Sequence, residues 1–240
     1  MTKPAIAETT LTEIADGLFR ISTRMPDLLP GGFTMNQFLV RDERSLLFHT
    51  GPRMLFDRVR DAVARVIDPR ALAYVSFSHL EADECGSINE WLALAPQAQA
   101  VCSTLAANVF LSDSADRPAI ALADGERLDL GRTRVRWLDA PHIPHGMDCG
   151  YMFEEQSRTL LCGDLFCQPG DVVPAVTEGD IFGPSEAMRA GFPYAPVRNP
   201  QQILEKLAAT EPVLLATMHG SSYRGDGAGL LRRLGAALAA

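Results

Sequence analysis

All five histidines of this 240-residue chain directly follow short apolar runs that are typical of β-strands. His49 ends SLLFH, His79 ends YVSFSH and His219 ends VLLATMH, while His142 and His145 follow TRVRWLDAP. A chance distribution would place some histidines on helix faces or in polar loops. The pattern therefore predicts a fold in which several strand ends converge on one site.

An acidic cluster surrounds one of these histidines. The segment SHLEADECGS places His79, Glu81 and Asp83 at alternate positions, with Glu84 immediately after them. Carboxylates this close repel one another and raise one another's pKa values unless a positive charge lies among them. A metal ion is the obvious candidate for that charge.

Asp164 extends the same pattern, because it directly follows an apolar run in LLCGDLF. An unpartnered aspartate there would carry a large desolvation cost, so it is paired, bound to metal or exposed at a turn. The nearby histidines favour metal. Asp148 is expected beside the ligands or on the surface.

The apolar periodicity predicts strands and helices along most of the chain. Strands are expected at residues 17–24, 34–40, 45–49, 72–78, 99–102, 125–131, 133–139, 150–155, 158–164 and 212–218. Helices are expected at 53–67, 86–95, 104–111, 201–210 and 229–240, and a long, partly ordered loop at 169–200. Strands interleaved with helices predict one domain over residues 1–240, of the α/β (α+β) class, with stacked sheets flanked by helices.

Composition and charge restrict the partners. A net charge of -8 and a pI near 5.1 argue against nucleic acid or an anionic membrane surface. The N-terminus lacks the apolar stretch of a signal peptide, and no run approaches the roughly 20 apolar residues of a membrane span. Five cysteines without framework spacing fit a reducing compartment, so we expect the cytoplasm. Cys85, Cys162 and Cys167 are expected to be packing residues.

The ordered residues resemble the metallo-β-lactamase fold superfamily, and more narrowly its flavodiiron and oxygen-binding diiron branch. That branch carries a His-x-Glu-x-Asp-His motif, then a lone His, a bridging Asp and a final His after a C-terminal strand. Here His79, Glu81 and Asp83 match the first motif, and Asp164 follows His145 by nineteen residues. The resemblance implies a four-layer αβ/βα sandwich of two packed mixed sheets flanked by helices.

The resemblance also implies two metal positions. The first would be held by His79, Glu81 and His145, and the second by Asp83 and His219. Asp164 would bridge the two metals. Glu84 stands where the branch has a histidine, so a ligand of the second metal is either replaced by a carboxylate or missing.

Three other positions bear on the ligand assignment. Zinc hydrolases of the superfamily carry a histidine where this chain has Glu81, so their ligand set does not fit. His49, in FHTG, and His142, three residues before His145, are each expected to contact a ligand rather than a metal. Residues 1–240 include no flavodoxin-like segment after the last histidine, so we expect no flavin bound by these residues.

Three imidazoles with three or four carboxylates form a hard ligand set that favours iron, with manganese or zinc as alternatives. The leading hypothesis is a non-haem diiron protein that binds or reduces O2, or NO, with electrons from a separate donor. A homodimer is compatible with it. The competing hypothesis is a dinuclear metallohydrolase that attacks an ester, thioester or phosphoester through a metal-bound hydroxide. The third is a structural metal site without turnover.

Side chains outside the ligand set could contribute to either chemistry. Arg189 and Tyr194, in FGPSEAMRAGFPYAP, could hold a small-molecule substrate or simply cover the metals. Ser221 and Tyr223 follow the final histidine, and Tyr223 is the candidate catalytic residue because its hydroxyl could donate a hydrogen bond or a proton to bound oxygen. Packing is the alternative role for Tyr223.

Overall fold

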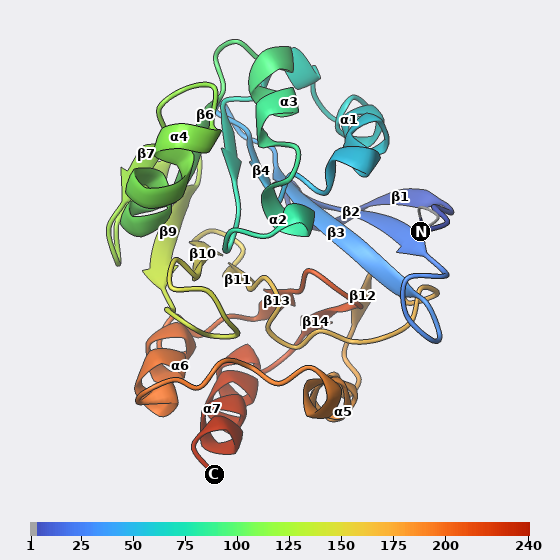
Figure 1. The fold of residues 1–240 in the computed structure, drawn as a ribbon, viewed down its shortest axis with the longest axis vertical. Helices are drawn as coiled ribbons and strands as arrows, with labels where there is room; N and C mark the ends of the chain where they lie inside the picture. Colours follow the sequence, from blue (N-terminus) through green and yellow to red (C-terminus); the bar gives the residue numbers. More distant parts are fainter. Residues whose placement is uncertain (1–3) are drawn as a thin grey trace.

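A computed structural model describes residues 4–240 as two seven-stranded mixed sheets that pack face to face between two layers of helices (Figure 1). The first sheet has the order β1-β2-β3-β4-β5-β6-β7, and the second has the order β12-β14-β13-β11-β10-β9-β8. This architecture confirms the four-layer αβ/βα sandwich.

The first sheet comes from the N-terminal half of the chain. Its strands are β1 (Thr9–Ala15), β2 (Leu18–Met25), β3 (Phe33–Val40), β4 (Leu46–Phe48), β5 (Tyr74–Ser76), β6 (Gln99–Ser103) and β7 (Ile120–Leu122). Strands β1 to β4 pair antiparallel, and β4 to β7 pair parallel. The parallel half needs crossover connections, and these supply the helices on the outer face.

The second sheet comes from the C-terminal half. Its strands are β8 (Arg127–Asp129), β9 (Arg134–Asp139), β10 (Gly150–Glu154), β11 (Thr159–Leu161), β12 (Val176–Thr177), β13 (Leu214–Ala216) and β14 (Ser222–Arg224). Strands β11 and β13 run parallel at its centre. The chain therefore leaves both strands at the same edge.

The helices form the two outer layers. Over the first sheet lie η1 (Arg53–Leu55), α1 (Phe56–Val63), η2 (Pro69–Ala71), α2 (Ala82–Cys85), α3 (Ile88–Leu94), the π-helical η3 (Ala106–Leu111) and α4 (Ser112–Ser114). Over the second lie α5 (Phe182–Gly191), α6 (Pro200–Ala208) and α7 (Gly227–Leu238). Within residues 4–240 no helix is long and apolar enough to cross a membrane.

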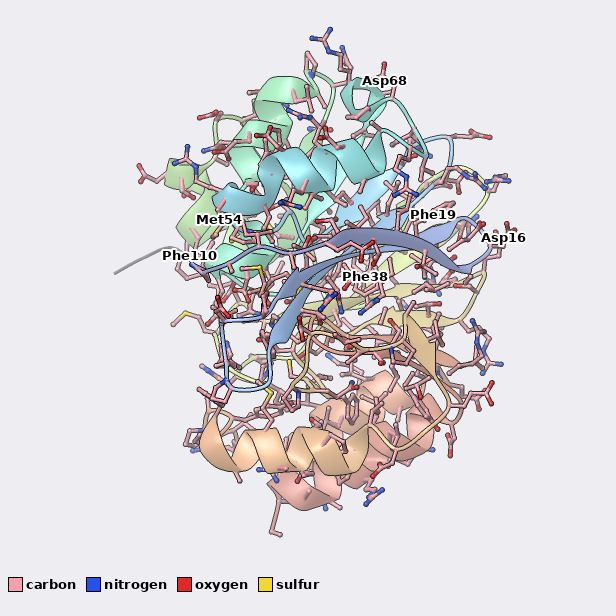
Figure 2. The ribbon with its side chains drawn as sticks, turned by 90° about the vertical axis from the view of Figure 1, so that its right-hand side faces the viewer. Asp16, Phe19, Phe38, Met54, Asp68 and Phe110 are labelled. Atoms are coloured by element: carbon pink, nitrogen blue, oxygen red, sulfur yellow. The ribbon has the colours of Figure 1, made fainter. Side chains whose placement is uncertain are left out.

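Strand alternation divides the apolar side chains into three buried layers. On β2 and β3, Phe19 and Leu39 face the helices over the first sheet, whereas Leu18 and Phe38 face the second sheet. Figure 2 shows Phe19 and Met54 on the helix side and Phe38 nearer the second sheet. Successive side chains of a strand point to opposite faces, so each sheet can contribute to two cores.

Most expected elements are confirmed, but the expected loop at residues 169–200 is wrong. That region contains β12 and the ten-residue helix α5. The carboxylate of Asp180 accepts hydrogen bonds from the backbone N–H groups of Phe182 and Gly183, which begin the helix. Phe182 is buried beneath Arg233, whose guanidinium carbon lies 3.9 Å from the ring centre. Tertiary burial therefore stabilises a helix in a segment whose glycines and prolines predict a loop.

Candidate metal centre

The connections that follow several strands converge at one edge of the sandwich. His79 follows β5, His145 lies between β9 and β10, Asp164 follows β11 and His219 follows β13. Backbone hydrogen bonds join these connections: Gly150 N–H donates to the Ser78 carbonyl across the two sheets (2.9 Å), and Met218 N–H donates to the Gly163 carbonyl within the second sheet (2.8 Å). The convergence expected from the histidine pattern is therefore present.

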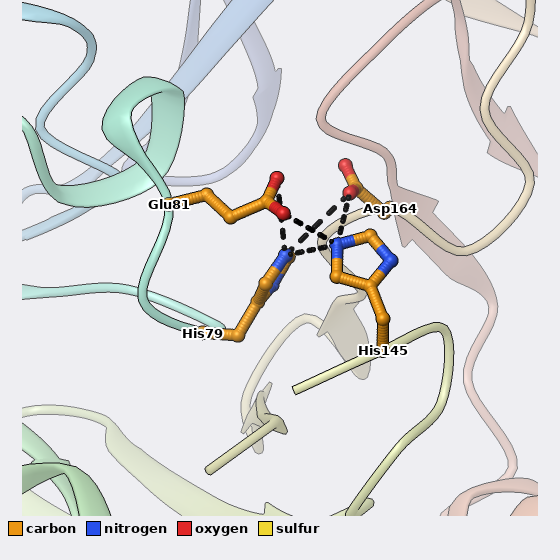
Figure 3. A group of neighbouring side chains, drawn as sticks. All are labelled: His79, Glu81, His145 and Asp164. Atoms are coloured by element: carbon orange, nitrogen blue, oxygen red, sulfur yellow. Dashed lines mark hydrogen bonds and ion pairs between the residues drawn. The ribbon is translucent and has the colours of Figure 1, made fainter. Parts of the chain in front are cut away.

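A first group of ligand atoms is compact. Nε2 of His79 lies 2.9 Å from Nε2 of His145, which lies 2.9 Å from Oε1 of Glu81 (Figure 3). Oε2 of Glu81 is 3.6 Å from His79 Nε2. Atoms about 2.1 Å from one metal and at right angles to each other lie about 3.0 Å apart, so this group has the spacing of metal ligands.

A second group lies deeper. Nε2 of His219 is 3.4 Å from Oδ2 of Asp83 and 3.4 Å from Oδ1 of Asp164. Two ligand atoms about 2.1 Å from a metal and at a tetrahedral angle lie about 3.4 Å apart. Burial alone raises the pKa of Asp83, but the hydrogen bond with His219 outweighs it and holds that pKa below its ordinary value.

Asp164 lies between the two groups and presents one oxygen to each. Oδ2 is 3.7 Å from His79 Nε2 and 3.9 Å from His145 Nε2, whereas Oδ1 faces His219. Burial raises the pKa of this carboxyl, but the hydrogen bond with His219 and the charges of the three histidines hold it well below its usual range. Asp164 therefore has the geometry of a bridging carboxylate.

The carboxylates raise the pKa of His219, and the histidines in turn lower the pKa of Glu81. Burial lowers the pKa of His219, but hydrogen bonds with Asp164 and Asp83 outweigh it and raise the pKa to about 10. Hydrogen bonds with His145 and His79 lower the pKa of Glu81 to about 2. The paired carboxylates therefore favour the positively charged form of His219.

Glu84 is the unusual member of the cluster. It is fully buried, and neither of its carboxylate oxygens has a hydrogen-bond partner among residues 4–240. Burial, together with the charges of Asp164 and Asp83, raises the pKa of Glu84 well above its ordinary value. A buried, unpaired carboxyl group is costly, and a cation beside it would remove that cost.

Polar partners orient the two buried ligand histidines, His219 and His79. Nδ1 of His219 donates to the Thr34 carbonyl at 2.6 Å, which leaves Nε2 free to face the carboxylates. Nδ1 of His79 lies 3.0 Å from Ser78 Oγ, which lies 3.2 Å from His49 Nε2. Burial lowers the pKa of His49 to about 3, so its ring is neutral and Nε2 can accept from Ser78. These contacts fix the tautomers that ligation by Nε2 requires.

Close backbone packing holds the connections together. Gly163 has a φ of 47°, and a Cβ there would lie 2.7 Å from Ser78 Oγ. Only glycine fits this approach between the His79 and Asp164 connections.

Asp148 is buried, and its Oδ2 accepts a hydrogen bond from the Leu80 backbone N–H at 2.9 Å. Of its two expected placements, Asp148 has the one beside the ligands.

A cavity of about 570 Å³ opens over the cluster. Its floor includes Glu81, Asp83, His145, Asp164 and His219. Its walls are largely apolar and include Leu29, Phe33, Met35, Met188, Phe192 and Tyr194. The segment that carries Arg189 and Tyr194 therefore lies beside the cluster, as expected.

Several expected contributors lie elsewhere. Tyr223 is not brought to the cluster: on β14 its side chain packs with the core beneath the second sheet, and its hydroxyl lies against Gly225. His142 is exposed, and its side chain makes no hydrogen bond within the described chain. Ser221 is buried, and its backbone is held by Gln168.

Two residues at the cavity contact Asp164: Tyr194, which was expected to hold a substrate or cover the metals, and Cys167, which was expected only to pack. Tyr194 donates from its hydroxyl to the Asp164 carbonyl at 3.3 Å. Cys167 Sγ lies 3.6 Å from Oδ1 of Asp164, so it faces the cluster as well as its packing neighbours. Neither position carries a local sequence signal, because the turns after β11 and α5 determine both placements.

The sandwich and the carboxylate-rich cluster define a metallo-β-lactamase-fold protein with a candidate two-metal centre. A family model described as ODP family beta lactamase matches residues 33–180, and the chain belongs to that family. The expected fold and branch are thereby confirmed.

Named relatives agree with this assignment. A diflavin flavoprotein A of Thermosynechococcus vestitus is 30% identical over 82% of this chain and 35% of its own length. The rubredoxin-oxygen oxidoreductase of Megalodesulfovibrio gigas is 27% identical over 82% of this chain and 51% of its own. The chain thus spans about a third to a half of these relatives.

A solved structure has the same fold. The metal-soaked flavodiiron core of Synechocystis sp. PCC6803 superposes with a TM-score of 0.82 at 23% identity, covering 98% of this chain and 61% of that one. At this identity the likeness concerns the fold.

Proposed function

We propose that this chain is a non-haem dinuclear iron protein that binds or reduces O2 or NO. The observation that carries the proposal is Asp164, whose two oxygens face two separate groups of ligand atoms. A carboxylate in that position can bridge two metals about 3.5 to 4 Å apart. The flavodiiron relatives support the same class of chemistry.

The proposed first position uses His79, Glu81 and His145, and the proposed second position uses Asp83 and His219, with Glu84 beside it. Oxygen ligands outnumber imidazoles, which favours iron or manganese over the nitrogen- and sulfur-rich sites typical of zinc. When bound, two ferrous ions supply two electrons to a diatomic ligand. The carboxylates offset the charge that the metals gain when those electrons leave.

The remaining residues control access and orientation. Thr34 orients the His219 imidazole, and Ser78 together with His49 orients the His79 imidazole, each with Nε2 toward its proposed metal position. Phe33 stacks on His219 with ring centres 4.1 Å apart and separates that side of the site from water. The apolar walls favour entry of a small uncharged molecule such as O2.

Repeated turnover requires an external electron donor, because two ferrous ions supply only two electrons. The name of one relative pairs rubredoxin with oxygen, and a small redox protein of that kind is the donor we propose. We propose further that residues 1–240 act as one domain, that two copies form a dimer, and that the chain works in the reducing cytoplasm, where its five free thiols persist.

A metallohydrolase remains the second candidate because of the cavity. A volume of about 570 Å³ exceeds what a diatomic molecule needs and lies within the range typical of organic ligands. The Arg189 guanidinium is engaged by Glu186, with Nε 2.9 Å from Oε1, and offers little to a phosphate. The apolar walls favour the acyl group of an ester or thioester.

The two candidates separate in one set of assays. Protein loaded anaerobically with ferrous iron is mixed with O2 and a chemical reductant, and oxygen uptake is followed with an electrode. Zinc-loaded protein is tested on ester and thioester substrates. We expect uptake that disappears in Asp164→Ala, and no hydrolysis. Hydrolysis without oxygen uptake would overturn the diiron proposal.

A further inference from the structure

Cys167 points into the deeper half of the metal centre. Its Sγ is 3.6 Å from Oδ1 of Asp164, and the ligand atoms of Asp164, Cys167 and His219 all lie within 4.8 Å of one another. The side chain is partly buried and forms part of the cavity floor beside the carboxylates.

The local backbone fixes this orientation. Phe166 has a φ of 60°, a left-handed conformation that turns the chain back toward the cluster after Asp164. Gln168, the residue after Cys167, donates from its backbone N–H to the His219 carbonyl at 3.3 Å. Its side-chain Nε2 also donates to the Ser221 carbonyl at 3.1 Å. Cys167 is therefore held between the connections that carry Asp164 and His219.

A second observation is that a buried carboxyl group in this half of the site has no hydrogen-bond partner among the residues that the structure describes. Glu84 is fully buried, and both its oxygens are without a hydrogen bond in the described part of the chain. One carboxylate oxygen of Glu84 lies within 4.8 Å of a carboxylate oxygen of Glu81 and of Asp83. The deeper position thus has one imidazole, a group of carboxylates and a buried carboxyl group whose oxygens accept no hydrogen bond from residues 4–240, which a nearby cation would stabilise.

We propose that Cys167 is a thiolate ligand of the second metal, together with Asp83, Asp164 and His219; this rests on the two-metal site proposed above. A sulfur about 2.3 Å and an oxygen about 2.1 Å from one metal, at a tetrahedral angle, lie about 3.6 Å apart, which is the observed Cys167–Asp164 separation. The S–H proton leaves to solvent as the metal–sulfur bond forms, so no oxidant or reductant is needed.

Thiolate ligation would make the two positions chemically unequal. The first position has only imidazole nitrogen and carboxylate oxygen, whereas the second gains a soft, electron-rich donor. Soft donors favour zinc, copper(I) and iron over magnesium or calcium. The second metal would therefore bind through a ligand set distinct from that of the first.

Cobalt provides the test, because a thiolate bound to Co²⁺ gives a near-ultraviolet charge-transfer band that nitrogen and oxygen ligands do not give. Metal-free protein is titrated with Co²⁺ without oxygen, for the wild type, for Cys167→Ser and for Cys85→Ser. Cys85 is the matched control because its Sγ donates to the Glu81 carbonyl close to the cluster.

We expect the band in the wild type and in Cys85→Ser, and its loss in Cys167→Ser. Two bound cobalt ions without the band in the wild type would overturn thiolate ligation while leaving the two-metal site intact. Failure of the wild type to bind cobalt would overturn both.

Alkylation of the wild type gives a result that does not depend on folding of the variant. Iodoacetamide labelling is measured for each cysteine by mass spectrometry, with and without Co²⁺. We expect Co²⁺ to slow labelling of Cys167 at least tenfold and to leave Cys85 unchanged. Equal labelling of Cys167 in both conditions would contradict the proposal.

Discussion

The two halves of the candidate metal centre are built differently. In the outer half, the side chains of His145 and Glu81 are 39% and 43% exposed, and their ligand atoms lie 2.9 Å apart. In the inner half, His219 is 5% exposed, and its distances to the carboxylates are 3.4 Å. The outer half follows a local sequence motif and one distant histidine, whereas the inner half depends on how the two sheets pack.

This difference has an energetic consequence. Burial in the inner half strengthens electrostatic interactions and makes each unpaired charge more costly. The inner half therefore gains more from a metal and tolerates an imperfect ligand set less well. Asp164 couples the halves because it contributes one oxygen to each.

Loss of the shared carboxylate should have the largest effect. We expect Asp164→Ala to reduce bound metal from two ions per chain to fewer than one, since both positions lose an oxygen ligand. Elemental analysis after gel filtration measures this, and circular dichroism checks that the fold persists. The exposed Asp113→Ala is the control. Retention of two metals would remove Asp164 from the site.

Loss of one imidazole should separate the halves. We expect His145→Ala and His219→Ala each to lose about one metal per chain, with the remaining ion in the other half. His142→Ala is the matched control, because that side chain is exposed and lies outside the cluster. Calorimetric titration with Fe²⁺ under nitrogen gives the stoichiometry. If either variant keeps both ions, its histidine is not a ligand.

Replacement of the buried glutamate should sharpen the inner half. Glu84→His introduces a neutral ligand where burial and neighbouring carboxylates disfavour an additional charge. We expect the second metal to bind as tightly as in the wild type or up to about tenfold more tightly, measured by competition with a chelator. Glu84→Leu offers no ligand atom, so it should weaken the second metal site if Glu84 is a ligand and leave it unchanged if Glu84 is not. Loss of the second metal in both Glu84→His and Glu84→Leu would show that the carboxylate is required.

A change beyond the ligands should have a smaller effect than loss of a ligand. Ser78→Ala removes the hydroxyl between His49 and His79 and frees the His79 ring to change tautomer. We expect metal affinity in the outer half to fall by about 10- to 100-fold, as is typical when a partner of a metal-bound histidine is lost. Affinity in the inner half should stay unchanged. An equal loss in both halves would point to general destabilisation.

The sequence and the family resemblance predicted candidate ligands for both halves, but not that Cys167 faces the inner half. His79, Glu81 and Asp83 follow β5 in a motif, and the histidines and Asp164 follow strands whose parallel ends must meet at one edge. The apolar periodicity predicted most of the strands and helices, their interleaved order predicted stacked sheets flanked by helices, and the family resemblance implied the four-layer sandwich.

What the sequence did not predict depends on long-range packing. Cys167 reaches the cluster through the left-handed turn at Phe166, a residue type that does not signal that conformation. The helix α5 is stabilised by burial of Phe182 against the C-terminal helix layer. Tyr223 was expected at the site because it follows the last ligand closely, but strand β14 turns its side chain to the opposite face.

The most direct test of the two-metal centre is the metal content of protein purified without oxygen, with the absorption spectrum recorded before and after admission of air. We expect two irons per chain and a new oxo-to-iron absorption band upon oxidation. Two zinc ions with no spectral change, or no more than one metal per chain, would contradict a dinuclear iron centre bridged by Asp164.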